Sequence, residues 1–333
     1  MNIPFIEQPK VLLDAALSRG RKGAAGYAQQ KTHFYTVKGK ELTKIDISGE
    51  YLEEKLFKAV SKFPSFDTLE PFYKDLYECI IDINELRKNL SSITSVARII
   101  KNQRREGLVK LKELKYVHGN EKKAFEITKA YVGRIASLLK GLKEPIAYFN
   151  ESARKLNELP SIKTNEECII IAGFPNVGKS TLLSKITESK PEIAAYPFTT
   201  KGLNVGVFHR RFMPIQVIDT PGLLDRPLHE RNKIELKAVT AFQYLEGTIL
   251  FAVDPLDDMI KQKGLFDELK KLFSKHKFMI VVTKTDISPA DKVEEVQKVF
   301  DSYEIILEGN GLNNLKERLM IREKKVSVSP AEN

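Results

Sequence analysis

The chain is poor in cysteine and has no tryptophan, and the shortage of cysteine excludes some classes of protein. Its 333 residues include two cysteines, Cys79 and Cys168. Two cysteines cannot supply a disulfide framework or a cysteine-rich metal site. Both lie in apolar stretches of sequence, where we expect each thiol to pack as a small hydrophobic side chain. The five histidines are scattered, so the sequence gives no support to a histidine-bound metal.

Long apolar runs are also missing. No stretch reaches the about 18 apolar residues that a membrane-spanning helix needs, and the first residues lack the pattern of a signal peptide. We therefore expect a soluble protein of the cytoplasm that has no membrane partner.

Positive charge is concentrated in the first half of the chain. The formal net charge is +10. Residues 1–163 contain 30 Lys and Arg against 20 Asp and Glu, whereas residues 164–333 contain 24 of each kind. This distribution favours a polyanion as the partner of the basic half. The alternative is a basic domain whose charge only aids solubility.

Two domains are expected from the length and the patterning. Residues 1–160 show helical spacing over 42–63, 71–90, 93–114 and 122–156, which predicts a basic all-α antiparallel bundle. Residues 165–321 alternate strand and helix patterns, which predicts a doubly wound, mostly parallel α/β sheet. Pro160 marks the junction, and residues 322–333 form a C-terminal tail. The expected strands lie near 167–172, 203–208, 214–219, 247–253, 278–283 and 303–307, and the expected helices near 179–188, 230–244, 258–274, 290–301 and 311–320.

The most specific motif is a glycine-rich turn between an apolar strand and a helix. It reads Gly173-Phe174-Pro175-Asn176-Val177-Gly178-Lys179-Ser180-Thr181. Loop N–H groups and the positive end of the helix dipole would converge there on phosphate. Lys179 would reach the β- and γ-phosphates, and the Ser180 hydroxyl would bind Mg²⁺. The nucleotide-binding candidates in this loop are Gly173, Pro175, Asn176, Val177, Gly178, Lys179, Ser180 and Thr181.

Two more nucleotide motifs follow in the usual order. Asp219-Thr220-Pro221-Gly222 ends an apolar strand, so Asp219 would hold Mg²⁺ and the Gly222 N–H would approach the γ-phosphate. Thr283-Lys284-Thr285-Asp286 follows a later strand. The Asp286 carboxylate would accept hydrogen bonds from guanine, but adenine would leave it unpaired. Thr283, Lys284 and Asp286 are therefore candidates for binding the base of GTP or GDP.

A segment between the first two motifs is expected to sense the γ-phosphate. It reads Tyr196-Pro197-Phe198-Thr199-Thr200-Lys201. A threonine there can bind Mg²⁺ through its hydroxyl, and loss of the γ-phosphate would release the loop. We prefer Thr200 to Thr199. The expected catalytic set is Lys179, Thr200, Asp219 and Gly222, and the metal ligands are Ser180, Thr200 and Asp219.

The residue after Gly222 is unusual for a GTPase. Many GTPases place a glutamine there to orient the attacking water, whereas this chain has Leu223, which cannot hydrogen-bond. Slow intrinsic hydrolysis is expected. Asn176 is a candidate ligand for a monovalent cation that would neutralise transition-state charge. The alternative is that Asn176 only stabilises its own loop.

Residues 19–40 contain six bases and no acid, with glycines and aromatic residues interleaved. We expect a flexible segment suited to RNA phosphates and unpaired bases. A mobile loop with its aromatic rings packed on the bundle is the alternative. The RNA-binding candidates are Arg19, Arg21, Lys22, Lys31, Lys38 and Lys40.

These motifs resemble those of the nucleolar GTP-binding protein 1 family, in the Obg–HflX group of P-loop GTPases, and the chain looks like an archaeal member. The resemblance covers nearly the whole chain. It rests on residues 173–181, on Ala195 to Lys201, on Asp219-Thr220-Pro221-Gly222-Leu223-Leu224-Asp225-Arg226-Pro227 and, in the helical half, on Phe63-Pro64, Pro71-Phe72-Tyr73 and Gly133-Arg134-Ile135-Ala136-Ser137.

The resemblance implies a GTP-hydrolysing factor in large ribosomal subunit assembly that holds rRNA and ribosomal proteins of a pre-ribosomal particle. Relatives with an apolar residue at the position of Leu223 often use K⁺, held by an asparagine at the position of Asn176. Ile305-Ile306 before Gly309-Asn310-Gly311 departs from the family's guanine-side loop. Two alternatives stay open: an RNA-binding scaffold with vestigial turnover, and a translation or stress GTPase on mature ribosomes.

Overall fold

The computed structural model describes residues 2–117, 119–188, 191–197, 199, 202–308 and 312–320. It divides into two compact units. The first unit comprises Met1–Thr68 and Ile81–Asn157, and the second comprises Leu69–Ile80 and Glu158–Asn333. The expected fold class, a helical region followed by an α/β domain, is confirmed. The expected tail, residues 322–333, lies outside the described residues.

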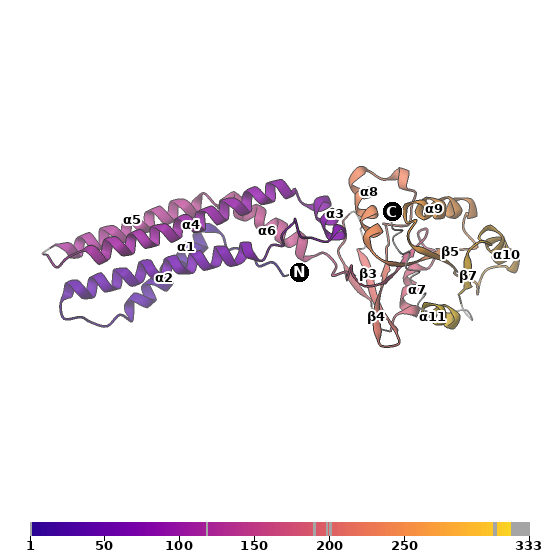
Figure 1. The fold of residues 1–333 in the computed structure, drawn as a ribbon, viewed down its shortest axis with the longest axis horizontal. Helices are drawn as coiled ribbons and strands as arrows, with labels where there is room; N and C mark the ends of the chain where they lie inside the picture. The colour runs from indigo at the N-terminus through magenta and orange to yellow at the C-terminus, as the bar shows by residue number, and fades with distance from the viewer. Residues whose placement is uncertain are drawn as a thin grey trace, which may run out of the picture. The chain divides into compact units, whose positions relative to one another are not determined.

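The first unit is helical. Helices α1 (Pro9–Ala25), α2 (His33–Ser61), α4 (Ile83–Glu113) and α5 (Asn120–Lys140) lie side by side, and α6 (Lys143–Asn157) packs against α4 (Figure 1). The long helices bury a stripe of residues, and in α4 its members are three or four positions apart: Leu86, Asn89, Ile93, Ala97 and Ile100. The expected bundle therefore forms from amphipathic helices.

Some helix boundaries differ from the expected ones. Residues 71–90 form two helices, because α3 (Pro71–Ile80) ends and Asp82 starts α4 by accepting hydrogen bonds from the N–H groups of Asn84 and Glu85. Residues 122–156 likewise divide into α5 and α6 at Gly141. Helix α3 groups with the second unit, whereas the sequence placed it within the bundle.

The prediction of a flexible segment over residues 19–40 is wrong. Only residues 26–32 lie between α1 and α2. A Cβ atom on Gly20 would lie 2.8 Å from the Lys44 carbonyl oxygen, and one on Gly39 would collide with the Tyr27 ring. These glycines therefore serve close packing of α1, α2 and the loop between them, and a single sequence does not distinguish that role from flexibility.

The second unit is built on one sheet with the strand order β2-β3-β4-β1-β5-β6-β7. Strands β1 and β4 to β7 run parallel, whereas β2 and β3 are antiparallel to their neighbours β3 and β4. Strand β2 was not expected from the sequence. The strands are β1 (Cys168–Ala172), β2 (Glu192–Ala194), β3 (Leu203–Arg210), β4 (Met213–Asp219), β5 (Gly247–Val253), β6 (Lys277–Val282) and β7 (Glu304–Leu307).

Helices cover both faces of this sheet. Leu250 shares a buried cluster with Leu182, Leu183 and Leu315, while the neighbouring Phe251 ring lies 5.2 Å from that of Phe266. The expected helix at 230–244 is interrupted. The helical segments are α7 (Lys179–Ile186), η1 (Leu228–Glu230), α8 (Lys233–Thr240), η2 (Ala241–Tyr244), α9 (Met259–Leu272), α10 (Ala290–Val299) and α11 (Leu312–Met320).

Neither cysteine shows signs of reactivity. Burial raises the pKa of the Cys168 thiol to about 12 and that of Cys79 to about 11, so both stay protonated at neutral pH. Within the described part of the chain, no helix is long and apolar enough to cross a membrane.

The packing role of Gly20 can be tested by adding a methyl group. Gly20→Ala is expected to lower the free energy of unfolding by about 1–3 kcal/mol, because the methyl group overpacks the α1–α2 contact. Gly133→Ala is the matched control: nothing lies within 4 Å of its added Cβ. There we expect stabilisation by about 0.5–1 kcal/mol. Urea unfolding of the full chain, followed by circular dichroism, measures both, and equal effects would contradict the packing role.

Candidate nucleotide-binding site

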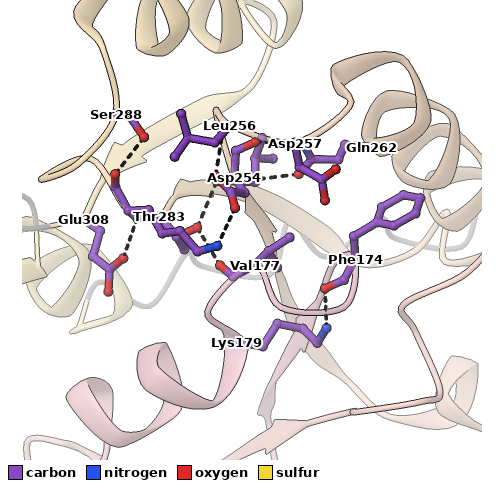
Figure 2. A network of polar contacts seen from close by, with 12 residues as sticks. Phe174, Val177, Lys179, Asp254, Leu256, Asp257, Gln262, Thr283, Ser288 and Glu308 are labelled. Carbon is purple, nitrogen blue, oxygen red and sulfur yellow. Dashed lines mark hydrogen bonds and ion pairs between the residues drawn. The ribbon is translucent and has the colours of Figure 1, made fainter.

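The loop after β1 has the backbone of a phosphate-binding loop. Asn176 and Gly178 have φ angles of 62° and 93°, in the left-handed region, and Gly173 has φ of 137°. A Cβ on Gly173 would collide with the Ala252 carbonyl oxygen, so only glycine fits. The Lys179 Nζ donates to the carbonyl oxygens of Gly173 at 2.7 Å and Phe174 at 2.6 Å. Figure 2 shows the Lys179–Phe174 contact. The lysine ammonium thus lies on the loop at the start of α7, where phosphate groups bind.

Ser180 and Asp219 meet in the same region. The Ser180 Oγ donates to Asp219 Oδ2 at 2.6 Å, and the Asn204 Nδ2 donates to the same oxygen at 2.9 Å. Asp219 is fully buried, and its Oδ1 finds no hydrogen-bond partner among the described residues. An unpaired buried carboxylate oxygen is costly, and hydroxyl and carboxylate oxygens are the ligands that Mg²⁺ prefers. The residues present therefore fit a magnesium ion.

Thr283 ties the phosphate loop to the loop expected to bind the base. Its buried hydroxyl lies 2.6 Å from the Val177 carbonyl oxygen and 3.1 Å from that of Val253. The single hydroxyl hydrogen is donated to the nearer oxygen, which belongs to the phosphate loop. Threonine at this position, where asparagine is usual, therefore still provides a donor.

The residues around Lys284 form a network that sequence reasoning missed (Figure 2). Lys284 adopts φ of 53°, and its Nζ pairs with Asp254 Oδ2 at 2.6 Å. Asp254 is buried at the end of β5, and its backbone N–H and carbonyl oxygen both bond to the Gln262 side chain. The only sequence signal for Asp254 was an acid directly after a buried strand.

Glu308 organises the same loop from the end of β7. It accepts hydrogen bonds from the Lys284 N–H at 3.1 Å, through its carboxylate, and from the Thr285 hydroxyl at 2.7 Å, through its backbone carbonyl. Asp286 is exposed, and no hydrogen bond or ion pair joins its side chain to the described part of the protein. The Asp286 carboxylate is therefore accessible to a base.

The residues just before the expected guanine-side loop differ from the family pattern for a structural reason. Ile305 and Ile306 lie within β7, where they pair with Ile280 and Val281 of β6. Their apolar character therefore serves the sheet. The following Gly309-Asn310-Gly311 lies outside the described residues.

The expected γ-phosphate sensor is described only in part. Thr200 and Lys201 lie outside the described residues, so the preference for Thr200 has no structural test. Thr199 is described, and its Cβ would lie 3.8 Å from a Cβ placed on Gly222. Tyr196 is buried, and its hydroxyl donates to the Ala238 carbonyl oxygen at 2.9 Å. The described part of this segment therefore lies beside the second phosphate motif.

Comparison with known proteins decides the family. Residues 1–163 match the family model of the NOG1 N-terminal helical domain, and residues 168–284 match that of the 50S ribosome-binding GTPase. The chain belongs to the nucleolar GTP-binding protein 1 family. The resemblance read from the motifs is thereby confirmed.

The family relatives differ in length. An uncharacterized protein of Methanocaldococcus jannaschii is 34% identical over 298 residues, which cover 88% of this chain and 82% of that protein. Nucleolar GTP-binding protein 1 of Saccharomyces cerevisiae is 31% identical over 306 residues, 90% of this chain. The chain spans about half, 47%, of the length of such fungal relatives. A crystal structure of a Plasmodium falciparum nucleolar GTP-binding protein 1 covers 48% of this chain and 87% of that one at 29% identity, with a TM-score of 0.41.

Within this family fold, the phosphate-loop candidates differ in exposure. Gly173, Val177 and Lys179 are buried, whereas Pro175, Asn176, Ser180 and Thr181 are exposed. The Asn176 side chain makes no hydrogen bond to the described residues. Its φ of 62°, in the left-handed region that asparagine adopts more readily than most residues, favours a role in shaping its own loop, and its role as a cation ligand stays a prediction.

The bridge made by Thr283 has a measurable consequence. Thr283→Val leaves the Val177 carbonyl oxygen without its donor, which costs about 1–3 kcal/mol, so GDP should bind about tenfold more weakly or worse. Thr283→Ser keeps the hydroxyl and serves as the control. Calorimetric titration with GDP compares the three proteins. Equal affinities for the valine and serine variants would contradict the bridging role.

Proposed function

We propose that this protein is a GTP-hydrolysing switch of the cytoplasm that acts in large ribosomal subunit assembly, with its helical unit bound to rRNA and ribosomal proteins of a precursor particle. The observation that carries this proposal is the convergence of the phosphate loop, Asp219 and Asp286 on one edge of the sheet. The description of the second family model, a 50S ribosome-binding GTPase, supports it. The concentration of the excess positive charge in residues 1–163 supports an RNA partner.

The site residues divide the chemistry among them. Lys179 and the N-terminus of α7 hold the β- and γ-phosphates. Ser180, Asp219 and Thr200 would hold Mg²⁺, which would supply positive charge to offset the charge that develops on the phosphate oxygens. Leu223 is apolar and buried, with 1% of its surface exposed, so its own side chain offers the attacking water no hydrogen bond. Intrinsic turnover is therefore slow, and Asn176 is the candidate ligand for K⁺.

Helix α3 offers a route from the nucleotide to the helical unit. The chain enters α3 from Thr68 and leaves it at Ile81, both in the first unit. The Phe72 ring of α3 lies 5.7 Å from the Phe242 ring, which lies 5.6 Å from that of Tyr196 in the γ-phosphate sensor. Lys237 of α8 pairs with Asp75 and Glu78 of α3. A shift of Tyr196 or α8 with nucleotide state would therefore reach α3 through packed side chains.

The RNA-binding surface that we propose differs in part from the sequence candidates. Lys38 is half-buried, and its Nζ donates to the carbonyl oxygens of Lys112 and Leu114 at 2.7 and 2.8 Å. Arg19 lies over the Tyr51 ring at 4.5 Å, and Lys40 is half-buried. Arg19, Arg21, Lys22 and Lys31 are exposed. These four therefore remain the stronger candidates for contacts with phosphate, while Lys38 positions the end of α4.

Two exposed aromatic rings lie beside this basic segment. The Tyr35 and Tyr116 rings stack with centroids 6.3 Å apart and an interplanar angle of 22°. Tyr35 is 47% exposed and Tyr116 64% exposed, and the buried Phe34 ring supports both. Lys31, Lys112 and Lys115 are exposed: Lys31 closely precedes Tyr35 in the chain, and the other two closely precede Tyr116. Exposed rings among lysines suit the stacking of unpaired RNA bases.

Crosslinking followed by sequencing of bound RNA tests the assembly role. We expect large-subunit rRNA from precursor particles when a GTP analogue is present. Co-sedimentation with mature ribosomes alone would favour a translation or stress GTPase, and absence of large-subunit rRNA would contradict the proposal.

Replacing Tyr35 and Tyr116 together by alanine should weaken RNA binding about tenfold or more, since each stacked base contributes about 1–3 kcal/mol. Tyr244→Ala, at an exposed tyrosine of the second unit, is the control.

The role of Asp286 is tested by base preference. Asp286→Asn replaces a double acceptor with an amide that complements xanthine better than guanine, so preference should move from GTP toward xanthosine triphosphate by about a hundredfold. Competition binding with both nucleotides measures this ratio. An unchanged preference would show that another group recognises the base.

The buried Leu223 also favours a second candidate function, an RNA-binding scaffold with vestigial turnover. Growth complementation by the Lys179→Ala variant separates the two. Full rescue would favour the scaffold, and failure to rescue would favour the switch.

A further inference from the structure

Asp225 engages the backbone group that the γ-phosphate is expected to use. The Gly222 N–H donates to Asp225 Oδ2 at 2.6 Å. Asp225 is buried, with 8% of its surface exposed, and Gly222 has φ of 77°. In a GTPase, contacts from this region to the γ-phosphate order the switch loops. Since one N–H cannot point at two anions, the Asp225 carboxylate and a γ-phosphate would compete for it.

A second hydrogen-bond donor, the Arg231 guanidinium, lies beside Asp225. The Arg231 Nη2 is 3.9 Å from Asp225 Oδ1, and the Arg231 side chain is 1% exposed. Its Nη2 donates to the Arg226 carbonyl oxygen at 3.3 Å, but its buried Nε has no hydrogen-bond partner among the described residues. A buried guanidinium N–H without an acceptor is costly. Arg231 therefore has capacity for a closer contact with the carboxylate.

We propose that Asp225 is an intramolecular competitor of the γ-phosphate and so sets the preference between GDP and GTP. Without a γ-phosphate, Asp225 holds the Gly222 N–H. With a γ-phosphate, that N–H turns to the phosphate, and Asp225 turns to Arg231. The free energy of this exchange enters the affinity for GTP but not the affinity for GDP. The inference rests on the proposed function only in requiring that the site binds guanine nucleotides.

Local turn closure is the competing explanation of the Asp225 contact. The N–H groups of Leu223 and Leu224 both donate to the Thr220 carbonyl oxygen, so residues 220–225 already form a tight turn. If Asp225 only closes this turn, its replacement should destabilise the loop and affect both nucleotides alike. The two explanations therefore differ in the ratio of affinities, and this ratio is insensitive to a general loss of folded protein.

The experiment compares the affinities of the full chain for GDP and for a non-hydrolysable GTP analogue. Asp225→Ala should raise affinity for the analogue by about tenfold, the equivalent of one charge-assisted hydrogen bond, and change that for GDP by less than about twofold. Asp225→Asn, which keeps the shape and a weaker acceptor, should give an intermediate ratio. Arg231→Met should act in the opposite direction and weaken the analogue several-fold, because Asp225 then loses its alternative partner. Glu230→Ala, at an exposed neighbour, is the control and should change neither affinity.

Opposite signs at Asp225 and Arg231 support the proposal, because a purely structural role would give the same sign at both. Weaker binding of both nucleotides by the same factor in both variants would overturn the proposal. An unchanged ratio of the affinities for GDP and the GTP analogue would also overturn it. Intact GDP binding in the unmodified protein, combined with an unchanged ratio, would overturn the role of Asp225 alone. Failure of the unmodified protein to bind GDP would overturn the proposed function as well.

Discussion

The parallel pairing of β4, β1, β5 and β6 is the constraint on which the site depends. Pairing Ile171 with Asp219, and Val253 with Val282, brings the loops that follow these strands to one edge of the sheet. Buried β-branched and aliphatic side chains on β1 and its neighbours hold the strands in this register. Polar groups far apart in the sequence therefore become neighbours without any direct link along the chain.

Hydrogen bonds between these loops then set their relative positions. The Thr283 hydroxyl joins the base loop to the phosphate loop, and Glu308 joins the base loop to the end of β7. Polar groups of the protein also contact the atoms expected to meet the ligand, as Ser180 contacts Asp219 and Asp225 contacts Gly222. Binding a nucleotide would exchange one set of hydrogen bonds for another, so small differences between ligands can select between loop conformations.

The sequence was sufficient to predict those parts of the site that are formed by one contiguous stretch of the chain. The phosphate loop is a contiguous strand, turn and helix, so Lys179 and Ser180 could be assigned from spacing alone. Asn204, Asp254 and Gln262 were missed because they act from a strand, a loop and a helix that only the tertiary fold brings close to the site. The membership of α3 in the second unit could not be read for the same reason.

The helical unit shows the same limit. Gly20 and Gly39 were interpreted as sources of flexibility, because glycine in a single sequence does not reveal what its missing side chain makes room for. Tyr35 was visible as an aromatic residue among bases, but its stacking on Tyr116 depends on the packing of α2 beside α4. The amphipathic pattern was sufficient to predict the class of fold, but it did not predict how side chains are arranged on the surface.

The most direct test of the account is calorimetry of the full chain with GDP and with ADP, each in the presence of Mg²⁺. The convergent loops predict saturable binding of GDP at one site per chain and at least about a hundredfold weaker binding of ADP, since adenine would leave the Asp286 carboxylate unpaired. Absence of GDP binding, or equal affinity for the two nucleotides, would contradict the central claim that this edge of the sheet is a guanine-nucleotide site.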